Sequence, residues 1–335
     1  MNAQSMLSMH SPPGYQVNFD ILQKFEQCLD TLQPEANPVP CKIRGYGEIS
    51  TVIEIQEKGM QGLVFKRISI FETPDEICSY LDIYLDYNRL LEEKAGINLP
   101  AHGHAALLNP DGRPVFYIIQ ESVPAFSIGN QLLRLLPAED GVMLVMCVLR
   151  ELHKVWQFNA NQTTYEIGLD GQISNWALRE FGGTDAHLQE PIHLVYIDTS
   201  TPLFRIQRQE QMDAEMHLRS APSFMAWILK VFFLEEVVNR YYDFRKVIID
   251  LLANLYKEQK DDLMPILLPK VNAFLDEEAA SLNIPPIALK ELQDYYREDA
   301  LIWSLYLSMR QFDRFLHARI LRHGYPYILP GKISR

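Results

Sequence analysis

The sequence has few cysteines and no pattern that would join them. Cys28, Cys41, Cys78 and Cys147 form no C-x-x-C pair, and four thiols in 335 residues do not predict a disulfide framework. We therefore expect reduced, buried cysteines in a cytoplasmic protein.

Long apolar runs are also missing. The most apolar stretch, residues 224–238, is interrupted by Lys230, Glu235 and Glu236, so it falls well short of the roughly 18 residues that cross a membrane. The first twenty residues lack the basic region and apolar segment of a signal peptide. They predict a mobile tail, and the sequence predicts no membrane span.

Basic residues are scarce relative to acidic ones, at 31 against 43, which gives a net charge of −12. This balance argues against nucleic acid as a partner, because affinity for a phosphate backbone comes from clustered Lys and Arg. It does not argue against a nucleotide, which needs only a few local cations and a metal ion. Hydrolase motifs of the G-x-S-x-G and H-E-x-x-H types do not occur, nor does the G-K-[ST] ending of a Walker A loop.

Apolar residues make up 47% of the chain, enough for a sizeable core. The pattern is strand-like before residue 125 and mainly helical after it, apart from a strand-rich stretch around 165–206. Long helices are expected at 140–158, 222–256, 262–282 and 286–322. This order predicts an α+β fold with a small β-rich part, a larger helical part and a cleft between them. The expected divisions are a flexible tail with a lead-in helix at 1–39, and domains at 40–124 and 125–335.

A glycine loop lies between two expected strands. The run Gly45-Tyr46-Gly47-Glu48-Ile49-Ser50 is a partial G-x-G-x-x-G pattern, with Ser50 at the third glycine position. A strand follows it, whereas a dinucleotide-binding loop requires a helix. Two interpretations remain open: a tight hairpin without a ligand, and a flap whose backbone N–H groups cover the phosphates of a nucleotide.

The next strand carries a lysine, and the helix after it begins with a capping box. Lys66 is either an edge lysine that reaches solvent or a cation that neutralises nucleotide phosphates. Thr73-Pro74-Asp75-Glu76 has the pattern of a helix N-terminus. Glu76 is the expected partner of Lys66, although capping alone would explain it. The alternative partners are Asp82, Asp86 and Glu93.

The strand-rich stretch contributes three polar residues. Asp170 and Asn175 are five residues apart, and the apolar run 194–197 ends at Asp198. Each fragment alone is close to chance, since Asp-Gly is an ordinary turn signal. The order of all the fragments along the chain is less accidental.

In this order the fragments resemble the protein-kinase-like superfamily, in particular its aminoglycoside- and choline-kinase-like branch, and we suspect an uncharacterised bacterial family of such proteins. The resemblance covers about residues 40–206. It implies a two-lobed fold, ATP and Mg²⁺ as cofactors, and a small-molecule acceptor. Asp170 would orient or deprotonate the accepting hydroxyl, and Asn175 and Asp198 would hold Mg²⁺. Nucleotide-binding positions would be Gly45, Gly47, Ser50, Lys66, Glu76, Gln120, Glu121 and Val123, the last three in a hinge that meets the adenine.

The chain departs from the family pattern at several positions. Gly168 stands where a histidine is usual, Thr199-Ser200 follows Asp198, and no Ala-Pro-Glu motif occurs after it. The missing motif favours a small-molecule acceptor over a protein, and the acceptor pocket is expected from helices after residue 206. Two alternatives stay open: a pseudokinase that binds without transferring phosphate, and a kinase-like fold that transfers AMP.

Other candidate residues have simpler explanations. His102 and His104 are expected in a loop, and His153 in a core. A stripe of aromatic residues in the last expected helix has helical spacing and predicts packing: Tyr295, Tyr296, Trp303, Tyr306, Phe312 and Phe315.

Overall fold

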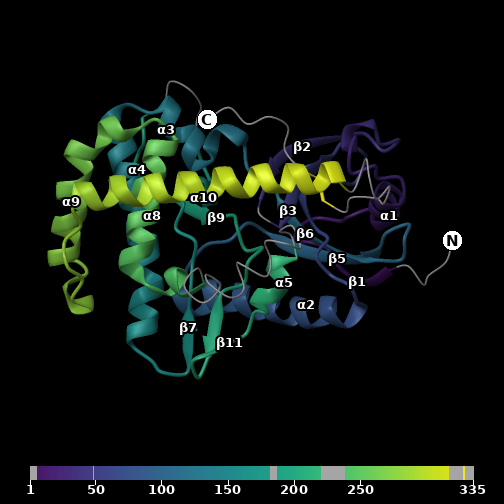
Figure 1. Cartoon of the computed structure of the whole chain (residues 1–335), viewed down its shortest axis with the longest axis horizontal. Coiled ribbons are helices and arrows are strands. Elements are labelled where there is room, and N and C mark those ends of the chain that lie inside the picture. The colour runs from purple at the N-terminus through teal and green to yellow at the C-terminus, as the bar shows by residue number, and fades with distance from the viewer. Residues whose placement is uncertain (1–5, 48, 182–186, 220–237, 317–326, 329–335) are drawn as a thin grey trace.

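The structure is a computed structural model that describes residues 6–47, 49–181, 187–219, 238–316 and 327–328. It has a β-sheet in its N-terminal region and mainly helices in its C-terminal region, as the α+β prediction requires. Figure 1 shows the strands of the N-terminal sheet at one end of the molecule and the helices α8 (Phe244–Lys257) and α9 (Met264–Glu277) at the other.

The sheet has six strands in the order β1-β5-β6-β4-β3-β2, and all neighbouring pairs are antiparallel. The strands are β1 (Met6–His10), β2 (Cys41–Tyr46), β3 (Ser50–Ile55), β4 (Leu63–Ile68), β5 (His102–Leu108) and β6 (Pro114–Glu121). β3 and β4 are rich in β-branched and aromatic residues, which suit a pleated surface covered on both sides. His102 and His104 therefore lie in strand β5, and the prediction of a loop was wrong.

Each face of the sheet is covered by a helix. Helix α1 (Phe19–Gln27) packs on one face through Leu22 and Phe25, and α2 (Pro74–Arg89) packs on the other through Tyr80 and Tyr84. Successive strand residues point to opposite faces, so β4 supplies a side chain to each layer in turn.

The first residues of the described chain belong to the sheet. Met6–His10 pairs with β5, and α1 is fixed by Glu26, whose carboxylate accepts two hydrogen bonds from Arg67 at 2.7 and 2.8 Å and one from the Tyr117 hydroxyl. Both charged residues of this ion pair are buried. The prediction of a mobile tail is therefore wrong from residue 6 onward.

Helix α2 begins as its sequence predicts. The Thr73 hydroxyl accepts a hydrogen bond from the Glu76 backbone N–H at 3.3 Å, and Pro74 is the first helical residue. The helix continues as a π-helical stretch, Leu90–Ala95, and ends at Gly96 with φ +70°.

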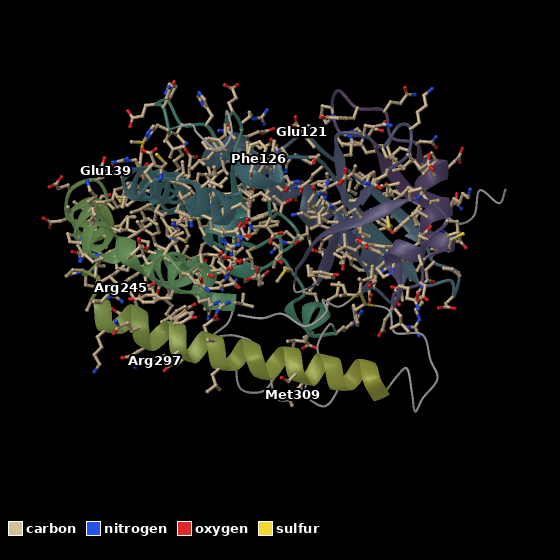
Figure 2. All side chains as sticks on the ribbon, turned by 90° about the horizontal axis from the view of Figure 1, so that it is seen from above. Glu121, Phe126, Glu139, Arg245, Arg297 and Met309 are labelled. Carbon is tan, nitrogen blue, oxygen red and sulfur yellow. The ribbon has the colours of Figure 1, made fainter. Side chains whose placement is uncertain are left out.

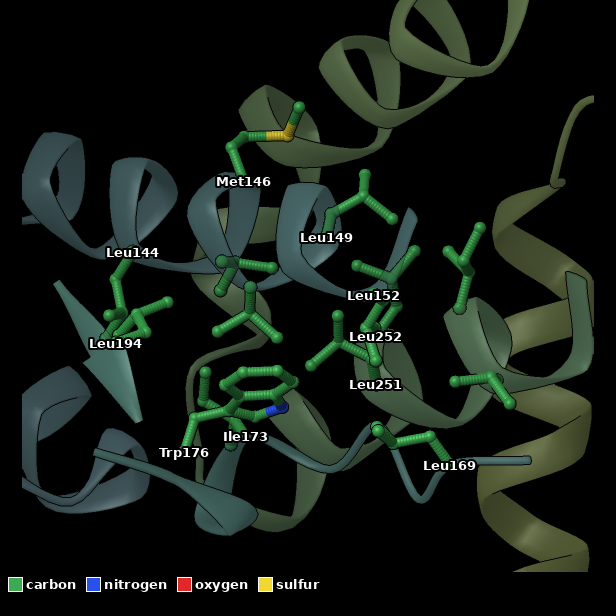
Figure 3. Packing of buried hydrophobic residues seen from close by; sticks show 14 of the residues in the cluster. Leu144, Met146, Leu149, Leu152, Leu169, Ile173, Trp176, Leu194, Leu251 and Leu252 are labelled. Carbon is green, nitrogen blue, oxygen red and sulfur yellow. The ribbon is translucent and has the colours of Figure 1, made fainter. Parts of the chain in front are cut away.

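The C-terminal region is built around one large apolar cluster. Its helices are α3 (Gly129–Leu135), α4 (Ala138–Ala160), α8 (Phe244–Lys257), α9 (Met264–Glu277) and α10 (Leu289–Leu316). Trp176 is fully buried among their leucines and isoleucines (Figure 3). Burying each such leucine contributes roughly 1.5–3 kcal/mol, so this cluster provides a firm base for the loops that rest on it.

The helices expected at 140–158, 262–282 and 286–322 were confirmed as α4, α9 and α10. The helix expected at 222–256 is interrupted, because a 3₁₀ turn at Arg240–Tyr242 precedes α8, and α8 begins at Phe244 with Asp243 as its N-cap. The segment 222–237 lies outside the described residues. Helix α10 packs on α8 through the Tyr256–Tyr296 ring pair, and it runs along the molecule toward the sheet (Figures 1 and 2).

Short strands connect α4 to α8. They form two small sheets, one of β8 (Trp176–Leu178) with β9 (Leu194–Tyr196), and one of β7 (Tyr165–Ile167), β10 (Phe204–Ile206) and β11 (Gln209–Glu210). A short helix, α5 (Ala214–Leu218), follows.

All four cysteines are free, as predicted, but they are not buried, because Cys28 and Cys78 are exposed and Cys41 and Cys147 are partly so. Among the described helices, none is long and apolar enough to cross a membrane.

Candidate functional site

Lys66 points from β4 toward the C-terminal region. It is 6% exposed, and its Nζ donates to the Ile197 carbonyl at 2.5 Å and to Asp198 Oδ1 at 3.3 Å. Of the two interpretations of Lys66, the edge lysine that reaches solvent is therefore wrong. Lys66 joins the sheet to a segment more than 130 residues later in the chain.

A hairpin brings Asn175 and Asp198 together. Strand β8 begins directly after Asn175, and β9 ends two residues before Asp198. Because Trp176 pairs with Tyr196, the residues just outside the pair also meet, and the Ile197 N–H donates to the Asn175 carbonyl at 2.8 Å. The long interval between the two polar residues is thus spanned by the hairpin, in which residues 182–186 lie outside the described part of the chain.

Asp198 is surrounded by donors. Its Oδ1 accepts from Lys66 and from the Ser200 hydroxyl at 2.7 Å, and 36% of its side chain is exposed. Desolvation would raise the pKa of Asp198, but the Lys66 ammonium and the Ser200 hydroxyl outweigh it, so the pKa lies below its usual value. This carboxylate stays ionised and available to a cation.

Asp170 lies in a different environment. Its Oδ1 accepts only from the Gln172 backbone N–H, at 3.1 Å, among the hydrogen bonds of the described residues. Burial, with the nearby carboxylates of Asp250 and Asp198, raises the pKa of Asp170 to about 7, against the opposing effects of the Gln172 N–H and Arg240. At neutral pH this carboxyl group can therefore both take up and release a proton.

Asp250 is a component that the sequence did not predict. It is 6% exposed on α8, and the Tyr295 hydroxyl donates to its Oδ1 at 2.9 Å. Burial raises its pKa, and Arg240 and Tyr295 oppose that shift. No motif marks it, because an acid within an apolar helix has no distinguishing neighbours in the sequence.

The glycine loop is a tight hairpin between β2 and β3. The Gly47 N–H donates to the Ser50 carbonyl at 2.8 Å, and a Cβ on Gly47 would lie 2.9 Å from Ser50 Oγ. Gly45 lies at an irregularity in the β2–β3 register, where its Cα partner is Val52. Glu48 is outside the described residues.

The predicted hinge begins in the last two residues of β6, Gln120 and Glu121, and continues beyond it to Val123. The N–H groups of Glu121 and Ser122 donate to the carbonyls of Ala101 and Gly62, both at 2.8 Å. Among the hydrogen bonds of the described part of the chain, none involves the backbone of Val123. The Gln120 amide points elsewhere, toward the Thr199 hydroxyl at 3.5 Å. Val123 is therefore the hinge residue whose backbone is available to a ligand.

Glu76 does not pair with Lys66, which corrects the prediction. Its carboxylate accepts from Arg219 at 2.8 and 3.1 Å and from the Glu72 backbone N–H at 2.8 Å. Glu76 is in the first turn of α2, where the end of α5 is its neighbour. Tyrosines occupy the inward positions of the same helix.

The unusual residues of the two acid-bearing loops have physical explanations. A Cβ on Gly168 would lie 3.0 Å from the Tyr242 ring, so a histidine side chain has no space there. The Ser200 hydroxyl is a hydrogen-bond donor to Asp198, a function that the usual Phe-Gly sequence cannot perform.

The donor set suits a hard cation. The Asn175 Nδ2 donates to the Asp170 carbonyl at 3.3 Å, which leaves Oδ1 as the free acceptor of that amide. An amide oxygen beside an ionised carboxylate is the type of ligand that Mg²⁺ takes, with phosphates completing its coordination. Among the described residues, no group of three His, Cys, Asp or Glu could hold a metal ion, so protein side chains alone do not form a closed site.

Two hollows in the described structure lie away from these residues. One of about 320 Å³ is lined by His10, His102 and His104, and one of about 290 Å³ by Arg179 and His193, with Glu92 and Leu99 common to both. Neither includes Lys66, Asp170 or Asp198, so the candidate site rests on its side-chain geometry alone.

Comparison with known proteins gives a family. Residues 45–314 match the sequence profile described as "Family of unknown function (DUF6206)". The chain belongs to this family. DUF6206 covers the sheet from Gly45 onward and most of the helical region, so the site residues between them all fall inside it. No curated protein matches the chain.

Among the solved structures that match this DUF6206 protein is one at low identity. It is "WaaP in complex with acyl carrier protein", with 14% identity, a TM-score of 0.32, and coverage of 76% of this chain and 96% of that chain. At this score the similarity carries no argument about the site.

Proposed function

We propose that this protein is an ATP- and Mg²⁺-dependent phosphotransferase that acts on a hydroxyl group of a small molecule. Its fold would be a two-lobed kinase-like one, with residues 40–124 binding the nucleotide and 125–335 carrying the acceptor site. The observation that carries the proposal is the contact of Lys66 with Asp198, beside a loop that presents Asn175 and Asp170.

Each residue of this site has a task in phosphoryl transfer. Lys66 would neutralise the phosphates, and Asn175 and Asp198 would hold Mg²⁺. Mg²⁺ held by these two residues would supply positive charge that offsets the charge developing in transfer. The hairpin from Gly45 through Gly47 to Ser50 would cover the phosphates with its backbone. Gln120, Glu121 and Val123 would form the hinge, with Val123 meeting the base.

Asp170 would act on the acceptor. The acceptor oxygen forms a bond to the γ-phosphorus, the bond from that phosphorus to the bridging oxygen breaks, and ADP leaves. The hydroxyl proton passes to the Asp170 carboxylate. A pKa of about 7 suits this task, because a general base works best when its pKa is near the working pH.

A binding protein without transfer is the second candidate. It is favoured by the pairing of Glu76 with Arg219, which leaves Lys66 without a carboxylate from α2 among the described contacts. Lys66 instead neutralises Asp198, the proposed metal ligand. Such a protein would bind a nucleotide without depending on Mg²⁺.

Thermal unfolding with and without ATP and Mg²⁺ tests the proposal. Ligand at 100 times its Kd adds about 2.7 kcal/mol, which raises Tm by several degrees in a chain of this size. We expect Asp198→Asn to abolish the Mg²⁺-dependent part of the rise. Glu139→Gln, which removes an exposed acid on α4 (Figure 2), should keep it.

The outcomes separate the candidates. Absence of any shift with any nucleotide would contradict both. A shift that needs neither Mg²⁺ nor Asp198 would support the binding protein. With a panel of hydroxyl compounds, release of ADP supports phosphoryl transfer, whereas release of pyrophosphate would indicate AMP transfer instead.

A further inference from the structure

Two buried tyrosines of α2 reach the two acid-bearing loops. The Tyr80 hydroxyl donates to the Ser200 carbonyl at 2.8 Å, and the Tyr87 hydroxyl donates to the Gly168 carbonyl at 2.9 Å. Both tyrosines are at most 3% exposed. Ser200 is two residues after Asp198, and Gly168 is two residues before Asp170, so each hydroxyl holds the backbone beside one acid.

The spacing of the tyrosines allows one helix to hold both loops. Seven residues are two helical turns, so Tyr80 and Tyr87 lie on the same face of α2. Tyr84 lies between them and is equally buried. Its hydroxyl is near Asn88 and Thr199 but outside the geometry of an ordinary hydrogen bond.

Among the hydrogen bonds of the described residues, each of these two carbonyls accepts only from its tyrosine hydroxyl, although other bonds hold the neighbouring backbone. On the Asp170 side, the Gly168 and Leu169 N–H groups donate to the carbonyls of Leu203 and Tyr241, at 2.9 and 3.0 Å. On the other side, the Ser200 hydroxyl turns back to Asp198. A buried carbonyl that loses its donor is costly, so removal of either hydroxyl would free the loop to move toward water.

We propose that Tyr80 and Tyr87 are positioning residues, which set Asp198 and Asp170 in place by hydrogen bonds to the loop backbones. This inference rests on the proposed function, since it assigns the tyrosines a task in the same site. Helix α2 thus contributes to the site through two tyrosine hydroxyls, which hold the loops of both acids, while its carboxylate Glu76 pairs with Arg219.

Tyr80→Phe and Tyr87→Phe test this inference, with Tyr84→Phe as the matched control. Each substitution removes one hydroxyl and leaves the ring in place. We expect amide hydrogen exchange to quicken about tenfold at residues 197–201 in Tyr80→Phe and at 168–175 in Tyr87→Phe, each in its own loop. Tyr84→Phe should change neither loop more than about twofold.

Kinetics provides the second measurement. Tyr87→Phe should lower kcat with the KM for ATP within about twofold, because it disturbs the acceptor side, whereas Tyr80→Phe should raise the Kd of Mg²⁺–ATP. Equal quickening of both loops and of the β3–β4 amides in either variant would overturn the inference, as would exchange like that of the wild type. If one variant does not fold, hydrogen exchange at the loop of the other variant still tests the inference.

The two proposals can fail separately. If the variants show loop-specific changes in exchange but the wild type binds no Mg²⁺–nucleotide, the proposed function is contradicted and the role of the tyrosine hydrogen bonds is supported. Nucleotide binding that the Tyr80 and Tyr87 variants leave unchanged, with unchanged exchange, would contradict the positioning alone.

Discussion

The loops around Asp198 and Asp170 differ in the charges that face them. Asp198 meets an ammonium and a hydroxyl, and its pKa is lowered. Asp170 meets two other carboxylates, and its pKa is raised to about 7. The two acids lie in one site, so the difference comes from their neighbours and not from depth alone.

The difference assigns separate tasks to the same chemical group. An acid that remains ionised is suited to a metal, and an acid that titrates near neutrality is suited to proton transfer. Four substitutions test whether the two acids differ in this way.

Asp170→Asn should have the largest effect. It removes the proton acceptor but keeps the Oδ1 that accepts from Gln172, so we expect transfer to slow about 10²- to 10⁴-fold with the affinity for Mg²⁺–ATP nearly unchanged. The measurement is ADP release beside nucleotide binding. Asp276→Asn, an exposed acid on α9, is the control. A loss of nucleotide affinity equal to the loss of rate would contradict the separation of tasks.

The same variant has a pH signature in stability. Because the folded-state pKa is raised, the unfolded chain releases the proton near pH 4 while the folded protein holds it until about 7. The wild type therefore loses stability as the pH rises between these values, and Asp170→Asn does not. Its Tm relative to wild type should increase from pH 5 to pH 8, by the equivalent of up to ~3 kcal/mol, because about two pH units of the shift fall inside that window.

Lys66→Met should have the next largest effect. It removes the cation that lowers the pKa of Asp198, so the carboxylate loses a charge-assisted hydrogen bond of about 1.5–3 kcal/mol. It also removes the cation that would neutralise the phosphates, so we expect the Kd for Mg²⁺–ATP to rise about 10- to 100-fold, measured by calorimetry. Lys246→Met, at an exposed position on α8, should bind as the wild type does. An unchanged Kd for Mg²⁺–ATP would mean that Lys66 only connects the sheet to the loop of Asp198 and does not bind the nucleotide.

Asp250→Asn should have a smaller effect, on the pH profile. It removes the like charge that contributes most, after burial, to the raised pKa of Asp170, while the Tyr295 hydroxyl can still donate to the amide oxygen. In the pH–rate profile, the pH at which the transfer rate falls on the acidic side should decrease by about one unit, whereas Asp276→Asn should leave that pH unchanged. If the rate still falls near pH 7 in Asp250→Asn, the charge of Asp250 does not contribute to the raised pKa of Asp170.

Glu76→Gln should have the smallest effect. Its partly exposed pair with Arg219 contributes about 0.2–1 kcal/mol to the free energy of unfolding, which a double-mutant cycle with Arg219→Gln would measure. Nucleotide affinity should remain that of the wild type. A loss of nucleotide affinity as large as that in Lys66→Met would contradict this prediction and indicate that Glu76 contributes to the nucleotide site.

Local patterns in the sequence predicted much of the fold. The Gly47 hairpin, the capping box at Thr73 and the helical period of α4 each depend on residues within one or two turns of each other. Strand β1 was missed because its pairing with β5 is set almost a hundred residues away.

The site was predictable only in part, for the same reason. The resemblance indicated Lys66, Asp170, Asn175 and Asp198, and the structure brings these residues to neighbouring loops. The partner of Glu76 is 143 residues further along the chain, and Asp250 has no sequence signal. Tyr80 and Tyr87 have the spacing of one helix face in the sequence, but the positions of their hydroxyls depend on loops 81 or more residues later in the chain.

The Glu26–Arg67 pair determines where the protein can be shortened. Arg67 is the neighbour of Lys66 on β4 and points to the opposite face, where helix α1 supplies its counter-charge. A chain that starts at residue 40, the boundary that the sequence suggests, would keep the guanidinium and lose the carboxylate. Removing one partner of a buried pair costs about 3–5 kcal/mol. The first helix thus stabilises the strand that presents Lys66, and we expect a chain shortened to start before that helix to be the more stable one.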